Sequence, residues 1–349
     1  MRINKNLLVL ILVFCIGSFF INFNVENKDI VKKNIKKEDT KLTKTNKKEF
    51  VGEITKSLFV PYWSLESDFN SNIYERVIYF GISTNENGIN KEEVGYKNLG
   101  KFSLINFINS KKYLTLRMLN TEDNLKILKN SSSTNQIIEQ TISIAKQNNF
   151  IGIVLDLEMS VLFGDDITSQ INEFSNSFYK EAKGNNLNYS VAIYGDVFYR
   201  KKPYDVSNLA KNSDEIMIMA YNFHKSIGEP GPNFPLDNAE VYGYDMKVLM
   251  DDFLSIVPPE KLTMIFGMYG YDWIVDDKGR PIRPAQSLSL NEIRNKHLND
   301  CNGEKCEFKD SDNKKHIIWY ENEESVSKKI EYLKSRGVGS FAYWAAGYF

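Results

Sequence analysis

Eight short apolar runs alternate along the chain with segments of helical periodicity, and this alternation is the strongest constraint on the fold. Runs that are apolar on both faces are typical of buried strands in a parallel sheet. Eight of them within about 300 residues predict a (β/α)8 TIM barrel; a doubly wound open sheet is the alternative, because periodicity alone does not close a barrel. The runs cover residues 58–63, 77–82, 113–118, 150–158, 189–194, 216–221, 263–269 and 340–344.

The segments between these runs carry apolar residues at the spacing of one helix face. Such stripes predict helices that pack against the sheet. Asn322 is the expected N-cap of the last helix. The stripes consist of positions 138, 142 and 145; 167, 171, 174 and 178; 246, 249, 253 and 256; and 326, 330 and 333.

The fourth run ends in two carboxylates. Strand side chains alternate between two faces, so Val154, Asp156 and Glu158 share one face. Two acids at the end of a buried strand are costly to desolvate unless they are partnered or used in chemistry. The alternative is that they meet solvent or cap the next helix.

The overall composition excludes several classes of function. The chain carries 44 basic and 45 acidic side chains, and this balance gives no electrostatic footprint for nucleic acid. Its three Cys and three His residues are too few and too scattered for a zinc site. No glycine-rich phosphate loop or dinucleotide fingerprint is present. We therefore expect neither a metal nor a cofactor.

The first 25 residues combine Arg2 and Lys5 with an uncharged apolar run over 7–23. This run is just long enough to span a bilayer, and no small-residue cleavage site follows it. We expect a signal anchor, although the lysines after it oppose that orientation; a cleaved signal peptide is the alternative, and both imply export. Residues 26–49 are rich in Lys, Asn and Thr and predict a flexible linker to a folded domain over 50–349.

The ends of the predicted strands carry the residues that indicate a function. Active sites of (β/α)8 barrels lie at the C-terminal ends of the strands. Besides Asp156 and Glu158, the runs end in Tyr221, Tyr269 and Trp344. Aromatic faces stack on sugar rings, and carboxylates transfer protons. The sequence therefore predicts a carbohydrate site at this end of the barrel.

In these motifs the chain resembles glycoside hydrolase family 18, the chitinase-like barrels, and within it the bacterial spore-germination and cortical-fragment glucosaminidases. The fourth-strand motif of the family, D-G-x-D-x-D-x-E, corresponds to residues 151–158, so that its last Asp and its Glu are Asp156 and Glu158. The Met-x-Tyr-Asp motif corresponds to 219–222, the Tyr-Gly-x-x-Trp pattern to 269–273, and the eighth-strand tryptophan to Trp344.

The resemblance implies substrate-assisted hydrolysis beside an N-acetylhexosamine, without a protein nucleophile. Glu158 would protonate the leaving oxygen and then activate water. Asp156 would accept the acetamido N–H, and Tyr221 would donate to the acetamido oxygen. Trp344 would form the floor of the sugar subsite, with Met219, Asn222 and Tyr269 lining it.

Two departures from the family pattern affect this site. Val154 stands where the family has an inner Asp that shares a proton with the residue at 156, and Asn222 replaces the acid of the Met-x-Tyr-Asp motif. Loss of one preorganised polar partner costs on the order of 10²–10³ in rate. Because Glu158 is present, we expect slower or differently tuned catalysis rather than an inactive site.

Cys301 and Cys306 flank a turn-rich stretch and are expected to form a local disulfide in an exported protein. They fall in a predicted insertion over about residues 273–316, between the seventh strand and the last helix. In the family this region often walls the sugar groove; a surface loop without a role is the alternative.

These observations predict an exported, membrane-tethered glycosidase that acts on N-acetylglucosamine-containing polymers. Peptidoglycan is favoured over chitin, because the bacterial branch fits best and a tether places the enzyme beside the wall. A lectin-like barrel without activity is the alternative, which Val154 and Asn222 favour and Glu158 disfavours. A scaffold that binds no sugar is the third hypothesis.

Overall fold

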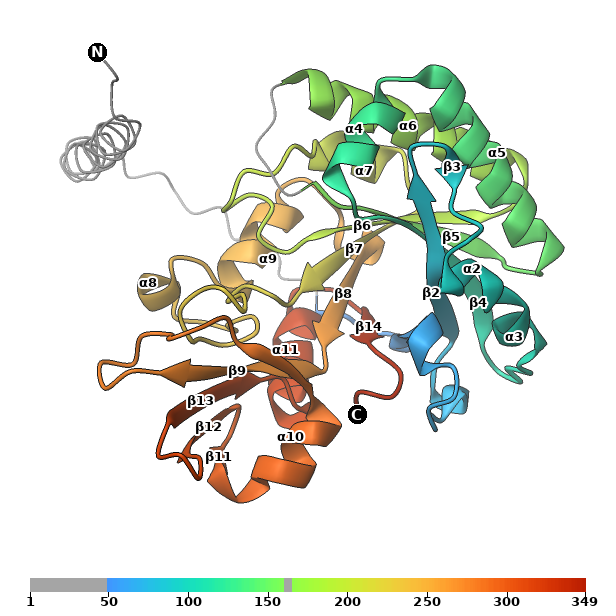
Figure 1. Ribbon diagram of the computed structural model, residues 1–349. Coiled ribbons are helices and arrows are strands. Elements are labelled where there is room, and N and C mark those ends of the chain that lie inside the picture. Colours follow the sequence, from blue (N-terminus) through green and yellow to red (C-terminus); the bar gives the residue numbers. More distant parts are fainter. Residues whose placement is uncertain (1–48, 160–164) are drawn as a thin grey trace, which may run out of the picture. The chain divides into compact units, whose positions relative to one another are not determined.

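Eight parallel strands close into a barrel in the computed structural model, which describes residues 49–159 and 165–349 (Figure 1). The strands are β1 (Thr55–Pro61), β2 (Arg76–Asn85), β4 (Lys111–Met118), β5 (Gly152–Leu157), β6 (Asn188–Tyr194), β7 (Glu215–Ala220), β8 (Leu262–Gly267) and β14 (Ser340–Trp344). Each pairs with the next in this order, and β14 closes the ring against β1. All eight predicted runs thus contain a strand, and closure confirms the barrel over the open sheet.

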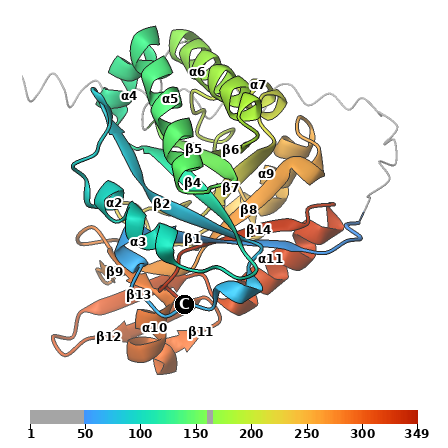
Figure 2. The ribbon, with the colours of Figure 1, turned by 90° about the vertical axis from the view of Figure 1, so that its right-hand side faces the viewer.

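Helices cover the outside of the barrel, as the apolar stripes predict. They are α2 (Val94–Lys97), α3 (Leu99–Leu104), α4 (Thr121–Leu128), α5 (Ser131–Gln147), α6 (Asp165–Gly184), α7 (Val206–Lys211), α9 (Met246–Leu254) and α11 (Glu323–Ser335). The short helix α8 (Ala239–Tyr242) buries none of its residues. Figures 1 and 2 show α4 to α7 along the outer side of β4 to β7. Asn322 caps α11 in a capping box with Ser325. One stripe residue is misassigned: Ile256 lies beyond the end of α9 and is exposed.

A second, antiparallel sheet is inserted between β8 and α11, and α10 (Leu290–His297) lies beside it (Figure 1). Its strands are β9 (Tyr269–Val275), β10 (Gln286–Ser289), β11 (Cys301–Asn302), β12 (Lys305–Lys309) and β13 (Lys315–Tyr320). The predicted bounds of the insertion, 273–316, are therefore too narrow. Only Met268 separates β8 from β9, so the two strands form one apolar run in the sequence, and Tyr269 belongs to the inserted sheet rather than to the barrel.

The remaining elements are short. Strand β3 (Gly88–Ile89) pairs antiparallel with the end of β2. Short 3-10 turns cover Tyr62–Ser64, Ser71–Ile73, Pro259–Lys261 and Leu298–Asp300.

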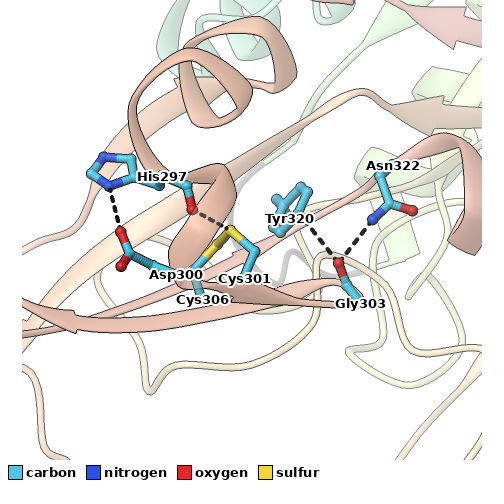
Figure 3. The surroundings of a disulfide bond; sticks show 7 residues. All are labelled: His297, Asp300, Cys301, Gly303, Cys306, Tyr320 and Asn322. Atoms are coloured by element: carbon cyan, nitrogen blue, oxygen red, sulfur yellow. Dashed lines mark hydrogen bonds and ion pairs between the residues drawn. A yellow bond between two sulfur atoms is a disulfide. The ribbon is translucent and has the colours of Figure 1, made fainter.

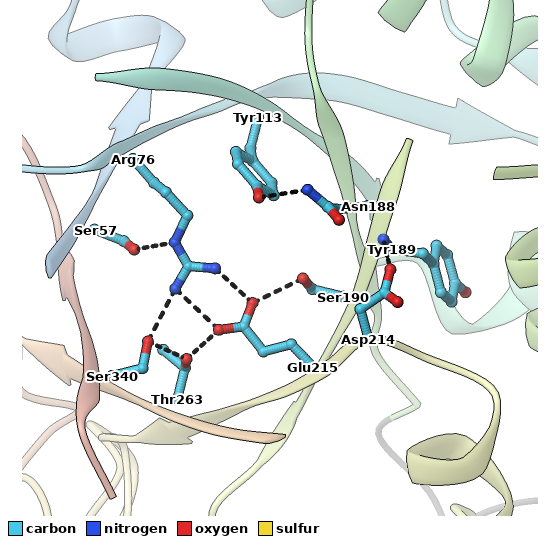
Figure 4. Close-up of polar contacts among 10 residues, drawn as sticks. All are labelled: Ser57, Arg76, Tyr113, Asn188, Tyr189, Ser190, Asp214, Glu215, Thr263 and Ser340. Atoms are coloured by element: carbon cyan, nitrogen blue, oxygen red, sulfur yellow. Dashed lines mark hydrogen bonds and ion pairs between the residues drawn. The ribbon is translucent and has the colours of Figure 1, made fainter. Parts of the chain in front are cut away.

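A buried ion pair fills the N-terminal end of the barrel interior (Figure 4). Arg76 on β2 donates from Nη1 and Nη2 to the two carboxylate oxygens of Glu215 on β7, at 2.8 and 2.9 Å. This bidentate geometry is the strongest form of such a pair. Side-chain hydroxyls complete the network, contributed by Ser57, Ser190, Thr263 and Ser340.

An apolar layer lies in the barrel between this ion pair and the C-terminal strand ends. It contains Phe59, Ile78, Val154, Ala192, Met217, Ile265 and Ala342. Together, the apolar layer and the ion pair occupy the barrel interior on the N-terminal side of the strand ends at which the active sites of such barrels lie.

Residues 1–25 and nearly all of the 26–49 linker fall outside the described residues, so the anchor and the linker stay predictions. In the part of the chain that the structure covers, no helix combines the length and apolarity needed to cross a bilayer.

Candidate active site

A cavity of about 270 Å³ opens at the C-terminal ends of the barrel strands. All seven residues that the sequence predicts for the sugar site line it: Asp156, Glu158, Met219, Tyr221, Asn222, Tyr269 and Trp344. Sequence reasoning missed the other lining residues, which are Phe59, Trp63, Phe80, Arg117, Leu119, Ala192 and Ile265. Several of these also lie at or near the C-terminal ends of the predicted strands. Selecting residues at those ends, which identified Tyr221, could therefore also have identified Arg117 and Trp63.

Strand β5 presents the two carboxylates to this cavity. Asp156 is 5% exposed, whereas Glu158, one residue beyond the strand, is half-buried. Burial and the charge of Glu158 raise the pKa of Asp156 well above its ordinary value, and Arg117 opposes this rise. Asp156 Oδ1 has no hydrogen-bond partner among the described residues. Asp156 therefore tends to hold a proton beside an ionisable neighbour.

Tyr194 holds the second carboxylate in place. It ends β6, the strand next to β5, and its hydroxyl donates a 2.7 Å hydrogen bond to Glu158 Oε2. Burial and the charge of Glu158 raise the pKa of Tyr194, so its phenol remains a donor. The sequence places Tyr194 at the end of the fifth run, but no motif of the family pattern singles it out.

Val154 occupies the position directly inward of Asp156 on the same face of β5. Its side chain is fully buried in the apolar layer and offers Asp156 no proton partner. Thr115, which pairs with Val154 in the β4–β5 register, is also buried, and its Oγ1 has no hydrogen-bond partner within the residues that the structure covers. With valine at this position, Asp156 Oδ1 and Thr115 Oγ1 are both buried without a hydrogen-bond partner among the described residues.

Asn222 adopts a left-handed backbone conformation, with φ of 58°. Asn and Asp tolerate this region better than most residues, so the exchange of one for the other preserves the turn. Its Oδ1 accepts hydrogen bonds from the hydroxyls of Tyr269, at 2.5 Å, and Tyr271, at 2.7 Å. Both tyrosines come from β9, so the inserted sheet orients this amide. Tyr271 is a further residue that the sequence prediction missed.

Tyr221 follows β7 and lines the same cavity as the acid pair. Burial and the charges of Asp156 and Glu158 raise its pKa well above the ordinary value. No side chain or backbone group in the described part of the chain forms a hydrogen bond with this hydroxyl. The Tyr221 O–H is therefore available to donate to a ligand.

Aromatic rings form one wall of the cavity around Trp344. Its ring centroid lies 4.6 Å from that of Phe80 and 6.2 Å from that of Trp63, both in edge-to-face geometry. Trp63 is 49% exposed and extends the wall toward solvent. The guanidinium carbon Cζ of Arg117 lies 4.7 Å from the centroid of the Phe80 ring, over its face. This wall suits stacking of sugar rings.

The disulfide of the inserted sheet lies away from this cavity. Cys301 and Cys306 are bonded to each other across the β11–β12 hairpin (Figure 3). Tyr320 and Asn322 both donate to the carbonyl of Gly303 at its turn. This turn borders a separate cavity of about 510 Å³. Among the described residues 269–320 of the insertion, only Tyr269 lines the cavity at the strand ends.

Comparison with known proteins agrees with this geometry. The model of glycosyl hydrolases family 18 matches residues 56–348. The chain belongs to this family. The resemblance that the strand-end motifs indicate is thereby confirmed.

Individual relatives of this family 18 protein are distant. Di-N-acetylchitobiase of Mus musculus is 25% identical over 241 residues, which cover 60% of this chain and 64% of the relative. The cortical fragment-lytic enzyme of Bacillus subtilis is 20% identical over 238 residues, 63% of this chain and 52% of the relative. The chain thus spans less than two thirds of either length. The crystal structure of the Ostrinia furnacalis Group IV chitinase superposes with a TM-score of 0.70 at 18% identity over 85% of this chain and 94% of that one, and so shows the same fold.

Proposed function

We propose that this family 18 protein hydrolyses β-linked N-acetylglucosamine-containing polysaccharide by substrate-assisted acid/base catalysis. One observation carries the proposal: Glu158, oriented by Tyr194, lies beside a buried Asp156 in a cavity with an aromatic wall. Burial makes Asp156 favour its protonated form. Two carboxyl groups whose environments differ in this way can take different roles in catalysis.

Each residue has a distinct task in this proposal. Glu158 protonates the leaving oxygen and then, as a carboxylate, takes a proton from the attacking water. The acetamido oxygen of the substrate attacks the anomeric carbon, since no protein side chain serves as nucleophile in this family. Asp156 interacts with the acetamido N–H and Tyr221 donates to its oxygen. Trp344 stacks on the sugar, while Met219, Asn222 and Tyr269 complete the subsite.

We further propose export, with peptidoglycan as the favoured polymer over chitin. The apolar run over 7–23 supports export and attachment to the membrane. The Cys301–Cys306 disulfide is in accord with an oxidising compartment. The similarity to a protein named cortical fragment-lytic enzyme, from a bacterium, supports a wall polymer.

A lectin-like barrel is the second candidate, because Val154 leaves Asp156 without a proton partner. To separate the two, the purified full chain is incubated with peptide-free peptidoglycan glycan strands and with an N-acetylglucosamine tetramer. Mass spectrometry of the products is the measurement. The enzyme proposal expects new reducing ends from both polymers, and more from the strands. Binding of both without any cleavage would establish the lectin instead.

A further inference from the structure

The ammonium group of Lys202 and the carboxylate of the proposed catalytic acid, Glu158, both contact Tyr194. The Nζ of Lys202 lies 4.4 Å from the centroid of the Tyr194 ring, the same ring whose hydroxyl donates to Glu158. Such a cation–π contact fixes the position of the ammonium on a flexible side chain. Glu158 is among the charges that act on this group. Lys202 thus lies at the edge of the site, on the side of the catalytic acid.

The loop that carries Lys202 is tied to the strand that carries Glu158. The hydroxyl of Tyr204 donates to the carbonyl of Leu157 at 2.7 Å and accepts from the backbone N–H of Met159 at 2.8 Å. These two contacts flank Glu158 in the chain. The backbone N–H of Tyr204 also donates to the carbonyl of Lys202. The separation between the ammonium and the catalytic acid is therefore set by the fold.

The neighbouring charges leave Lys202 without an ion-pair partner. Arg200 forms an ion pair with Asp196 and donates a 2.8 Å hydrogen bond to the carbonyl of Phe223, so it already has partners. Neither Lys202 nor the exposed Lys225 has a carboxylate within ion-pair distance in the described ranges. Burial, and then the charge of Lys225, lowers the pKa of Lys202 despite the opposing charge of Asp196. An anion placed here would relieve the repulsion between the two ammonium groups.

We propose that Lys202, assisted by Lys225, binds a carboxylate that the substrate carries on the sugar next to the bond that Glu158 protonates. This inference rests on the proposed function and deepens it, because it assigns a residue to the choice of polymer. Chitin is uncharged there, whereas the N-acetylmuramic acid of peptidoglycan carries a lactyl carboxylate. A charge-assisted hydrogen bond to a half-buried ammonium is worth roughly a 10- to 100-fold preference for the anionic sugar.

Binding to a catalytically disabled chain tests this site without turnover. In the full chain with Glu158→Gln, calorimetric titration compares a tetrasaccharide of alternating N-acetylglucosamine and N-acetylmuramic acid with the same compound after reduction of its carboxylates to alcohols. We expect the anionic ligand to bind at least about 10-fold more tightly. Adding Lys202→Gln should bring the ratio of the two dissociation constants close to one.

A matched control is Lys211→Gln in the same background. Lys211 is an exposed lysine at the end of α7, which leads into the N-terminal end of β7 and so lies at the opposite end of the barrel. The ratio should stay as in Glu158→Gln alone. Equal affinities for the two ligands, binding of neither, or a ratio that survives Lys202→Gln would overturn the inference. Hydrolysis of a neutral N-acetylglucosamine tetramer by the unmodified chain, measured in parallel, persists if only this inference fails and is absent if the proposed function fails.

Discussion

The hydroxyl of Tyr194 donates a 2.7 Å hydrogen bond to Glu158 Oε2 and so joins the ends of two adjacent barrel strands at the acid that we assign to proton transfer. This bond holds one carboxylate oxygen. The other, Oε1, has no hydrogen-bond partner among the described residues, and Glu158 lines the cavity. The geometry leaves one oxygen to move a proton while the other is fixed, as preorganised acid/base catalysis requires.

Removal of this bond by Tyr194→Phe should lower kcat by roughly 10-fold or more, because a hydrogen bond to a charged group is lost at the acid. The KM should change less, since the Tyr194 ring stays in place. Steady-state hydrolysis of an N-acetylglucosamine tetramer measures both. Tyr199→Phe, at an exposed tyrosine that does not line the cavity, is the control. An unchanged kcat in Tyr194→Phe would show that the bond has no catalytic role.

Introduction of the missing carboxylate by Val154→Asp should have two opposite effects. Activity should rise on the order of 10-fold, because Asp156 gains a proton partner where preorganised groups matter most. Stability should fall, because a polar group enters the apolar layer of the barrel. Val154→Leu, a change of shape without a carboxyl group, controls for packing. Activity that falls equally in both variants would contradict the assignment of Val154 as the cause of slow catalysis.

The raised pKa of Asp156 predicts a pH dependence of stability. The folded chain keeps a proton on Asp156 over a pH range in which the unfolded chain has lost it. The free energy of unfolding should therefore decrease as the pH rises above the ordinary aspartate pKa of about 4. Asp156→Asn removes this contribution. Thermal unfolding at pH 4 and pH 8 should show a smaller decrease in Tm for the variant than for the unmodified chain; equal decreases would place the titration elsewhere.

The ion pair beneath the apolar layer should make a large contribution to stability when one partner is removed. Glu215→Gln leaves the Arg76 guanidinium buried without its counter-charge, and the free energy of unfolding should fall by about 3–5 kcal/mol. Urea denaturation measures this change. Glu324→Gln, which disrupts the exposed pair with Lys328, should leave the midpoint nearly unchanged. Similar midpoints for both variants would mean that the Arg76–Glu215 ion pair does not stabilise the barrel.

The barrel and most of its candidate site could be predicted from the sequence, because both follow from the order of the strand-like runs and from the residues at their ends. Strand ends of a closed parallel sheet converge, so Asp156, Tyr221 and Trp344 could be brought together from their positions alone. Tyr269 contributes to the cavity for a different reason, since it lies on the inserted sheet and not on β8. It lines the cavity, although it lies on β9 and not on the barrel strand that the sequence predicts for it.

What the sequence could not supply are contacts between residues far apart in the chain. The bonds from Tyr194 to Glu158, and from Tyr269 and Tyr271 to Asn222, depend on strand register and on the turn that follows β7. The bounds of the insertion were missed because Tyr269 continues the apolar run of β8. The cation–π contact of Lys202 has no sequence signal, since nothing in the run Arg200-Lys201-Lys202 indicates which of its cations meets Tyr194.

The most direct test of the account is the rate at which Glu158→Gln hydrolyses an N-acetylglucosamine tetramer, relative to the unmodified chain. Proton transfer by a positioned side chain contributes roughly 10²–10⁴-fold, so the variant should be slower by that factor while its affinity for the tetramer is retained. Equal rates of hydrolysis in the two proteins, with the tetramer bound by both, would contradict the assignment of Glu158 as the catalytic acid.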